Sequence, residues 1–142
     1  MHFLIKALIA TTLMVVSVCA QGAFINLPAP GSSITAGTNF TVQIGLPDTL
    51  TNSDEISIVI GIQSCPTGNC FPISEAMGTV LYEGPFNPEF GSGADDPYED
   101  FSVQVPASFA TGQAQLGLAH FNLIGALLFP NLQLVNETVY VV

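Results

Sequence analysis

Apolar and polar residues alternate with a period of two along much of the chain. Phe40, Val42 and Ile44 are separated by polar residues, and the same alternation runs from Ile56 to Ile62 and from Phe101 to Val105. Successive side chains of a β-strand point to opposite faces, so this pattern predicts strands with one buried and one solvated face.

Four further segments have strand-like composition, and turn-forming residues separate the candidates. The further strands are expected at Phe24–Leu27, Gly78–Glu83, Ala114–Leu123 and Gln133–Val141. Turns are expected at Pro28–Ser33, Pro47–Asp54, Pro85–Pro97, Pro106–Gly112 and Pro130-Asn131. About seven short strands without an amphipathic helix predict an all-β fold, an immunoglobulin-like two-sheet β-sandwich. A small closed barrel is the alternative.

The N-terminus has the features of a secretory signal peptide. Lys6 precedes a largely apolar stretch from Ala7 to Val18, and small residues end at Ala20. The predicted organisation is a signal peptide at 1–20 and a single sandwich domain at 21–142, secreted and outside any membrane once cleaved. An uncleaved anchor helix is the alternative, because the apolar run is nearly long enough to span a bilayer.

The charge of the chain limits its partners. Lys6 is the only Lys or Arg, and all eleven acidic residues lie beyond Gln21, so the domain without its signal has a net charge of −11 with His neutral. Nucleic-acid binding depends on Lys and Arg contacts to phosphate and is excluded. Attraction to anionic lipid headgroups fails for the same reason. Basic proteins and divalent cations remain as partners.

The secreted context determines how two cysteines and two glycosylation sequons are interpreted. Cys65 and Cys70 are expected to form a disulfide that closes a small loop, since secretion exposes them to oxidant. A redox function is the alternative, but no cation lies nearby to activate a thiolate. Asn39 and Asn136 begin sequons on the polar faces of their strands, where a glycan would stay in solvent.

The most charged segment contains Asp95, Asp96, Glu99 and Asp100. Four carboxylates in one loop suit calcium, although the spacing is not that of an EF-hand and Pro97 restricts the backbone. A solvated loop that protects the following strand edge is the simpler interpretation. Paired carboxylates also suggest a glycosidase, but such sequence-adjacent acids are poorly placed to flank a scissile bond. We therefore expect a protein that is not an enzyme and that needs no metal or other cofactor.

His120 is the only histidine beyond the signal peptide. It shares strand parity with Leu116 and Leu118, so we expect it near the core. A Ser-His-Asp arrangement is the alternative, but no nucleophile motif supports it.

The segment from Phe121 to Pro130 is almost wholly apolar although it connects two expected strands. One interpretation is that the strand continues, or that the loop folds back onto the core and buries Leu127 and Phe129, and we favour this outcome. The other is an exposed surface that binds a partner protein. In that case Leu123, Leu127, Leu128 and Phe129 are the candidate contacts, together with the acidic segment.

The order of short motifs resembles the necrosis-inducing secreted protein family of fungal effectors. The similar elements span nearly the whole chain beyond the signal, in the order Pro30-Gly31 to Ile34, Ala36-Gly37-Thr38, Phe40-Thr41-Val42, Ile58-Val59-Ile60-Gly61, Met77 to Tyr82, Gly84-Pro85, Val105-Pro106, Gly112-Gln113-Ala114, Leu118 to Phe121, Gly125-Ala126 and Asn136 to Val139.

The resemblance implies a secreted virulence protein that suppresses pattern-triggered immunity in plants by binding receptor-associated kinases, outside the fungus and in some cases inside the host cell. The Cys65–Cys70 loop and the acidic segment are departures that put the kinase partner in doubt more than the fold. The alternative function is a structural or adhesive protein of the cell wall that binds polysaccharide.

Overall fold

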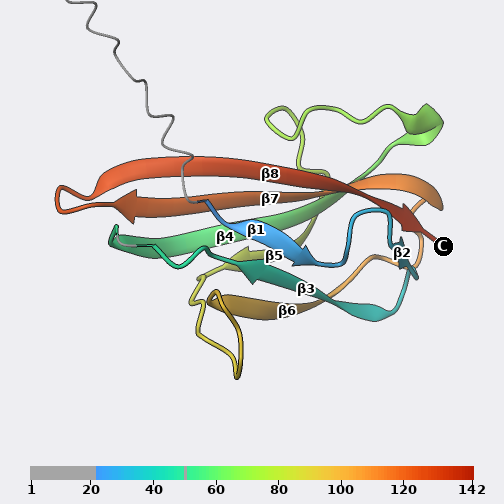
Figure 1. Cartoon of the computed structure of the whole chain (residues 1–142). Helices are drawn as coiled ribbons and strands as arrows, with labels where there is room; N and C mark the ends of the chain where they lie inside the picture. The colour runs from blue at the N-terminus through green and yellow to red at the C-terminus, as the bar shows by residue number, and fades with distance from the viewer. Residues whose placement is uncertain (1–21, 50) are drawn as a thin grey trace, which may run out of the picture.

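The computed structural model describes residues 22–49 and 51–142, and the predicted signal peptide lies outside them. The described chain forms eight strands and one short 3-10 helix (Figure 1). These elements are β1 (Phe24–Leu27), β2 (Ser33–Ile34), β3 (Asn39–Gly45), β4 (Ser53–Ser64), η1 (Pro66–Gly68), β5 (Thr79–Gly84), β6 (Tyr98–Gln104), β7 (Gly112–Ile124) and β8 (Phe129–Val141).

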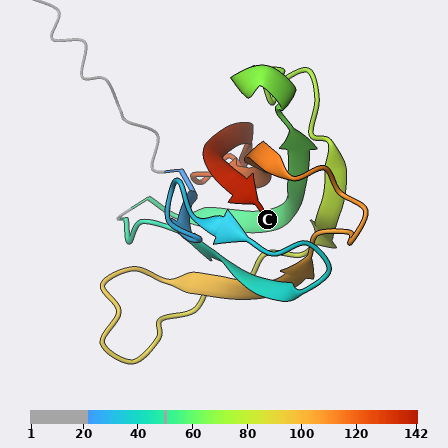
Figure 2. The ribbon, with the colours of Figure 1, turned by 90° about the vertical axis from the view of Figure 1, so that its right-hand side faces the viewer.

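The strands form two sheets that lie against each other as two layers (Figure 2). The smaller sheet has the order β1-β3-β6 and the larger has the order β2-β8-β7-β4-β5. All pairs are antiparallel except β2, which runs parallel to the end of β8. The predicted two-sheet sandwich is confirmed, and the alternative of one closed barrel is wrong.

The inner faces of both sheets supply the core, as the alternating pattern predicts. Burying one such Val, Ile, Leu or Phe side chain stabilises the fold by about 1.5–3 kcal/mol. The core consists of Ala23, Ile34, Val42, Ile44, Ile58, Ile60, Ile62, Phe86, Phe101, Val103, Val105, Ala114, Leu116, Leu118, Val139 and Val141.

The seven predicted strands are all present, but the sequence did not indicate β2. This strand has only two residues, too few to display a period of two. It exists because the amide of Tyr140 donates to the carbonyl of Ser32, and the amide of Val142 donates to that of Ile34. A contact with the distant end of the chain therefore defines it.

The disulfide between Cys65 and Cys70 is present, as predicted. It closes the first part of a longer segment, residues 65–78. This segment folds over the outer face of the larger sheet and is called the covering loop below. The side-chain amide of Gln63 donates to the carbonyls of Phe71 and Ala76, both at 3.0 Å. Ile73 fills the space above Gly117, where a Cβ would lie 2.5 Å from its Cδ1. The covering loop thus lies over Gly61, Gln63 and Gly117 on the larger sheet.

Within the described residues, no helix is both long and apolar enough to cross a membrane.

Candidate functional site

The β7–β8 hairpin carries Leu127, the most exposed large apolar side chain of the described chain. Leu127 is 95% exposed and Phe129 is 67% exposed, so the favoured expectation that this segment is buried is wrong. β7 and β8 have 13 residues each, whereas β3 and β6 have seven. The hairpin therefore extends past the smaller sheet, and no described element covers its tip (Figure 1).

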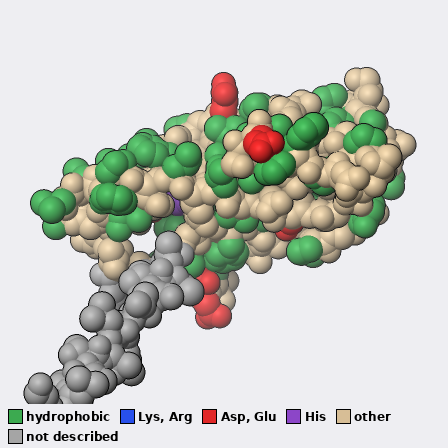
Figure 3. Space-filling model, turned by 90° about the horizontal axis from the view of Figure 1, so that it is seen from above, with side chains coloured by type: hydrophobic (Ala, Val, Ile, Leu, Met, Phe, Trp, Pro, Cys, Tyr) green, Lys and Arg blue, Asp and Glu red, His purple; other side chains and the backbone are tan. Residues whose placement is uncertain are grey.

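The exposed apolar surface continues from the hairpin tip along β8. It is called the apolar hairpin surface below. The space-filling view shows hydrophobic side chains at the hairpin tip and no acidic side chain among them (Figure 3). Of the four candidate residues, Leu127, Leu128 and Phe129 are exposed, while Leu123 is half-buried. The surface consists of Leu127, Leu128, Phe129, Leu132 and Leu134.

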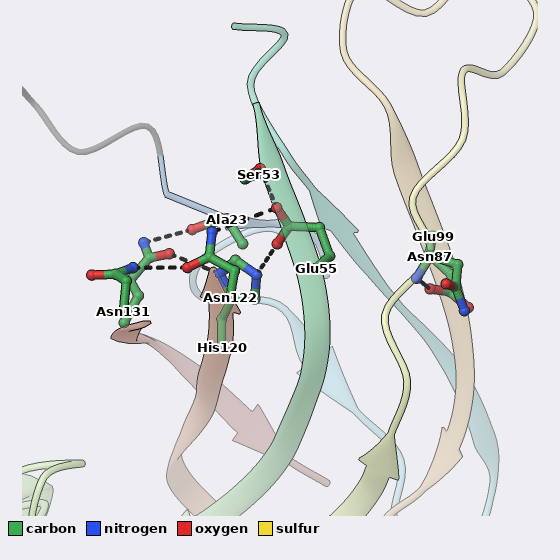
Figure 4. A network of polar contacts seen from close by, with 9 residues as sticks. Ala23, Ser53, Glu55, Asn87, Glu99, His120, Asn122 and Asn131 are labelled. Carbon is green, nitrogen blue, oxygen red and sulfur yellow. Dashed lines mark hydrogen bonds and ion pairs between the residues drawn. The ribbon is translucent and has the colours of Figure 1, made fainter. Parts of the chain in front are cut away.

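The acidic segment lies at the start of β6, and its carboxylates are held apart by different partners. Asp96 accepts a hydrogen bond from the amide of Asp48 at 2.9 Å, and Asp100 accepts one from the Gln43 side chain at 2.7 Å. Glu99 accepts a bond from the amide of Asn87 at 2.6 Å (Figure 4). No group of three or more His, Cys, Asp or Glu among the described residues is arranged to hold a metal ion.

The connection between β3 and β4 brings the two candidate segments to the same end of the sandwich. At one side of this connection, Asp48 contacts Asp96. At its other side, the carbonyl of Asn52 accepts a hydrogen bond from the amide of Gly125 in the hairpin turn at 2.9 Å. Segments nearly thirty residues apart in sequence therefore border one surface.

Two hollows lie side by side at this end and share Ser53 and Asp54. The first, about 520 Å³, is lined by the hairpin turn, including Leu128. The second, about 480 Å³, is lined by Glu89 and by Phe90, whose side chain is 59% exposed. Both hollows thus combine apolar side chains with carboxylates, and Asp54 belongs to each.

Negative charge is concentrated at this end of the molecule. Eight of the eleven acidic residues belong to the strand ends and loops there, and only three lie elsewhere. Because the described chain contains no Lys or Arg, His120, which contacts Glu55, is its only side chain that can carry a compensating charge. The eight residues are Asp48, Asp54, Glu55, Glu89, Asp95, Asp96, Glu99 and Asp100.

A buried polar network supports the base of the hairpin (Figure 4). His120 is fully buried, and its Nε2 contacts a carboxylate oxygen of Glu55. Its Nδ1 lies 3.3 Å from the side-chain oxygen of Gln133, whose amide donates to the carbonyl of Ala23 at 2.9 Å. The network therefore ties β4, β7, β8 and the residues before β1 to one another.

Glu55 points inward because of a β-bulge that the alternating pattern did not reveal. The register of β4 against β7 shifts between Glu55 and Ser57, so two residues face one on β7. The side chain of Ile56 is consequently 42% exposed, and the prediction that it belongs to the core face is wrong. Only the pairing partner reveals such a shift.

The electrostatics of Glu55 reflect two opposing effects. Burial alone would raise the pKa of its carboxyl group. Hydrogen bonds from His120, Ser53 and Asn122, with the charge of His120, outweigh burial, and the pKa of Glu55 is lowered from its usual value. The carboxylate is therefore held in its charged form.

This network does not form a catalytic triad. Both ring nitrogens of His120 are engaged, by Glu55 and Gln133, and neither contacts a hydroxyl group. The ring also packs edge-on against Phe86, with centroids 5.5 Å apart. The Ser-His-Asp alternative is wrong, and the expected position of His120 in the core is confirmed.

Both sequon residues, Asn39 and Asn136, are exposed. Asn39 begins β3 in the smaller sheet, and Asn136 lies on the outer face of β8. Their surroundings leave room for a glycan, and whether either carries one stays a prediction.

Comparison with known proteins supplies the family. A search among curated proteins finds no match to this chain. The Nis1 family model, by contrast, matches residues 20–140, from before β1 to one residue before the end of β8. Since the match extends over most of the chain, the protein belongs to the Nis1 family, a family of fungal effector-like proteins.

Proposed function

We propose that this protein is a secreted, non-enzymatic effector that suppresses plant pattern-triggered immunity by binding receptor-associated immune kinases. Membership of an effector-like family supports the biological setting. The proposed binding mode rests on one observation: the acidic segment and the apolar hairpin surface lie at the same end of the sandwich. We also propose that the protein can provoke host cell death, the property for which the necrosis-inducing secreted protein family is named.

The proposed mechanism is occupancy of a kinase surface. Stable protein interfaces combine an apolar centre that loses water with a polar or charged periphery. Leu127 and Phe129 would supply the centre, because they are large, exposed and uncharged. Asp95 and Asp96 would face basic side chains of the kinase and accelerate association by electrostatic attraction. The bound kinase would be unable to reach its own partners or substrates.

Direct binding tests this proposal. The chain from Gln21 to Val142 is titrated with the cytoplasmic kinase domain of a plant immune co-receptor, at low and high salt, beside an unrelated acidic sandwich domain. We expect saturable binding that weakens as salt rises. The pair Asp95→Asn and Asp96→Asn should reduce this salt dependence, whereas the matched pair Glu75→Gln and Glu83→Gln, away from the acidic end, should leave it unchanged.

A second variant tests the apolar part of the surface. Replacing both Leu127 and Phe129 with Ser should weaken binding by about tenfold or more, mainly through faster dissociation. The exposed Phe71 of the covering loop, changed to Ser, is the matched control. Binding no stronger than that of the unrelated domain would overturn the kinase proposal. Retention on insoluble chitin or glucan would then favour the wall-associated function.

A further inference from the structure

The outer edge of β8 is only partly paired among the described residues. β2 covers it at Tyr140 and Val141, and the amide of Gly31 bonds to the carbonyl of Thr138 at 2.7 Å. Backbone groups alternate in direction along a strand, so even-numbered residues of β8 direct theirs to this edge. The amides and carbonyls of Leu132, Leu134 and Asn136 consequently face outward with no partner in the described chain.

This free stretch is symmetric about its central residue, Leu134. On one side it ends at Pro130, which has no amide hydrogen to donate. On the other it ends at Thr138, whose carbonyl is already bonded to Gly31. Three residues with two free backbone groups each thus lie between two end residues that each have only one.

The side chains along this edge lack the usual protection against pairing. Natural edge strands commonly carry charged residues, which prevent association with another strand. Here Leu132 is 65% exposed and Leu134 is 39% exposed, and the chain from Gly125 to Asn136 contains no charged residue. Since the molecule is otherwise strongly acidic, this is where two copies can approach with least repulsion.

We propose that two copies of this chain associate through antiparallel pairing of their β8 strands, about a twofold axis at Leu134. Leu134 exchanges both hydrogen bonds with its counterpart, and Leu132 exchanges both with Asn136 of the second copy. The two larger sheets then form one continuous sheet. Antiparallel pairing places the acidic ends on opposite sides of the dimer.

The test measures mass in solution. The chain from Gln21 to Val142, which holds all the described elements, is produced in bacteria so that it carries no glycan. Sedimentation equilibrium or light scattering is then recorded from micromolar to millimolar concentration. We expect the mass to rise to twice that of the monomer. A monomer throughout this range would overturn the proposal.

Two variants with the same change of charge locate the contact. Leu134→Lys places two cations at the twofold axis and should leave only monomer, with circular dichroism confirming that the fold persists. Leu127→Lys adds its charge at the hairpin tip, off the free edge, and should still dimerise. A dimer that survives Leu134→Lys would overturn the proposal, as would one that only Leu127→Lys disrupts, because the contact would then lie at the tip.

Discussion

At the scale of single residues, two glutamates meet opposite environments inside the same sandwich. Glu55 has partners for its carboxylate, whereas Glu137, on the inner side of β8, has a buried oxygen without a hydrogen bond among the described residues. Burial raises the pKa of Glu137 to about 7. The two residues are therefore expected to make stability depend on pH with opposite signs.

Replacing Glu55 with Gln should destabilise the fold near neutral pH. Because the folded-state pKa of Glu55 lies below its usual value, its contribution is present above about pH 4.5 and is lost as pH falls through the folded pKa. We expect Glu55→Gln to lower the free energy of unfolding at pH 7 by about 1–3 kcal/mol. Urea unfolding between pH 7 and pH 3 measures this loss, which should shrink toward the acid end.

The control for this change is Glu75→Gln on the exposed covering loop, which should unfold like the wild type. Equal stability of Glu55→Gln and wild type at pH 7 would show that the contact with His120 contributes nothing.

Glu137→Gln should have the opposite effect and stabilise the protein at alkaline pH. The pKa of Glu137 is raised in the folded state, so its ionisation penalty is absent below about pH 4.5 and complete above about pH 7. Partial exposure reduces this penalty through solvent screening, and we expect a rise in Tm of about 3–5 °C at pH 8 and none at pH 4. Thermal unfolding of Glu137→Gln, with Glu83→Gln as control, measures this rise in Tm. An equal rise in Tm at pH 4 and at pH 8 would contradict the expectation.

At the scale of elements, the covering loop depends on small residues in the strands beneath it. A Cβ on Gly61 would lie 2.5 Å from the carbonyl oxygen of Met77, which is rigid backbone. A Cβ on Gly117 would meet the end of the Ile73 side chain, which can rotate away. Two glycines under one loop therefore differ in their tolerance of a methyl group.

We expect Gly61→Ala to lower the free energy of unfolding by about 1–3 kcal/mol, because the loop must shift to relieve the overlap. Gly117→Ala is the matched variant and should cost distinctly less. Urea unfolding of both proteins measures the difference. Cleavage after the exposed Glu75 by a glutamate-specific protease should also accelerate in Gly61→Ala alone. Equal costs in the two variants would show that the loop yields readily.

Strand positions were largely predictable because alternation and strand-forming composition are local properties, and seven of the eight strands were predicted from them. The exceptions have a common cause in pairing. Ile56 fits the alternation but is displaced by a bulge set against β7, and β2 forms only because the end of β8 lies beside it. Exposure of the hairpin was not predictable either, since it depends on how far the opposite sheet extends.

At the scale of the whole molecule, the proposed dimer and the predicted glycan at Asn136 exclude each other. Asn136 points from the outer face at the pairing edge, where Leu132 of a second copy would lie. Asn39, in contrast, belongs to the smaller sheet and is remote from this edge. Glycosylation would therefore decide whether the secreted protein associates.

Protein from a glycosylating eukaryotic host should be monomeric if Asn136 carries a glycan. Asn136→Gln should restore the dimer, because it removes the glycan and keeps the backbone groups of β8. Asn39→Gln should not restore it. Light scattering on the two variants, with mass spectrometry of glycan occupancy, makes this comparison, and a dimer that retains its glycan at Asn136 would contradict it.

The sequence by itself determined the fold class, the disulfide and the acidic character of the domain. Each depends on local periodicity, on a short loop between cysteines, or on composition. Only the tertiary structure decided that the acidic segment and the apolar hairpin share one end, that Glu55 faces His120, and that part of the β8 edge has no partner among the described residues. These features depend on strand order, register and relative strand length, which arise from contacts between residues far apart in the chain.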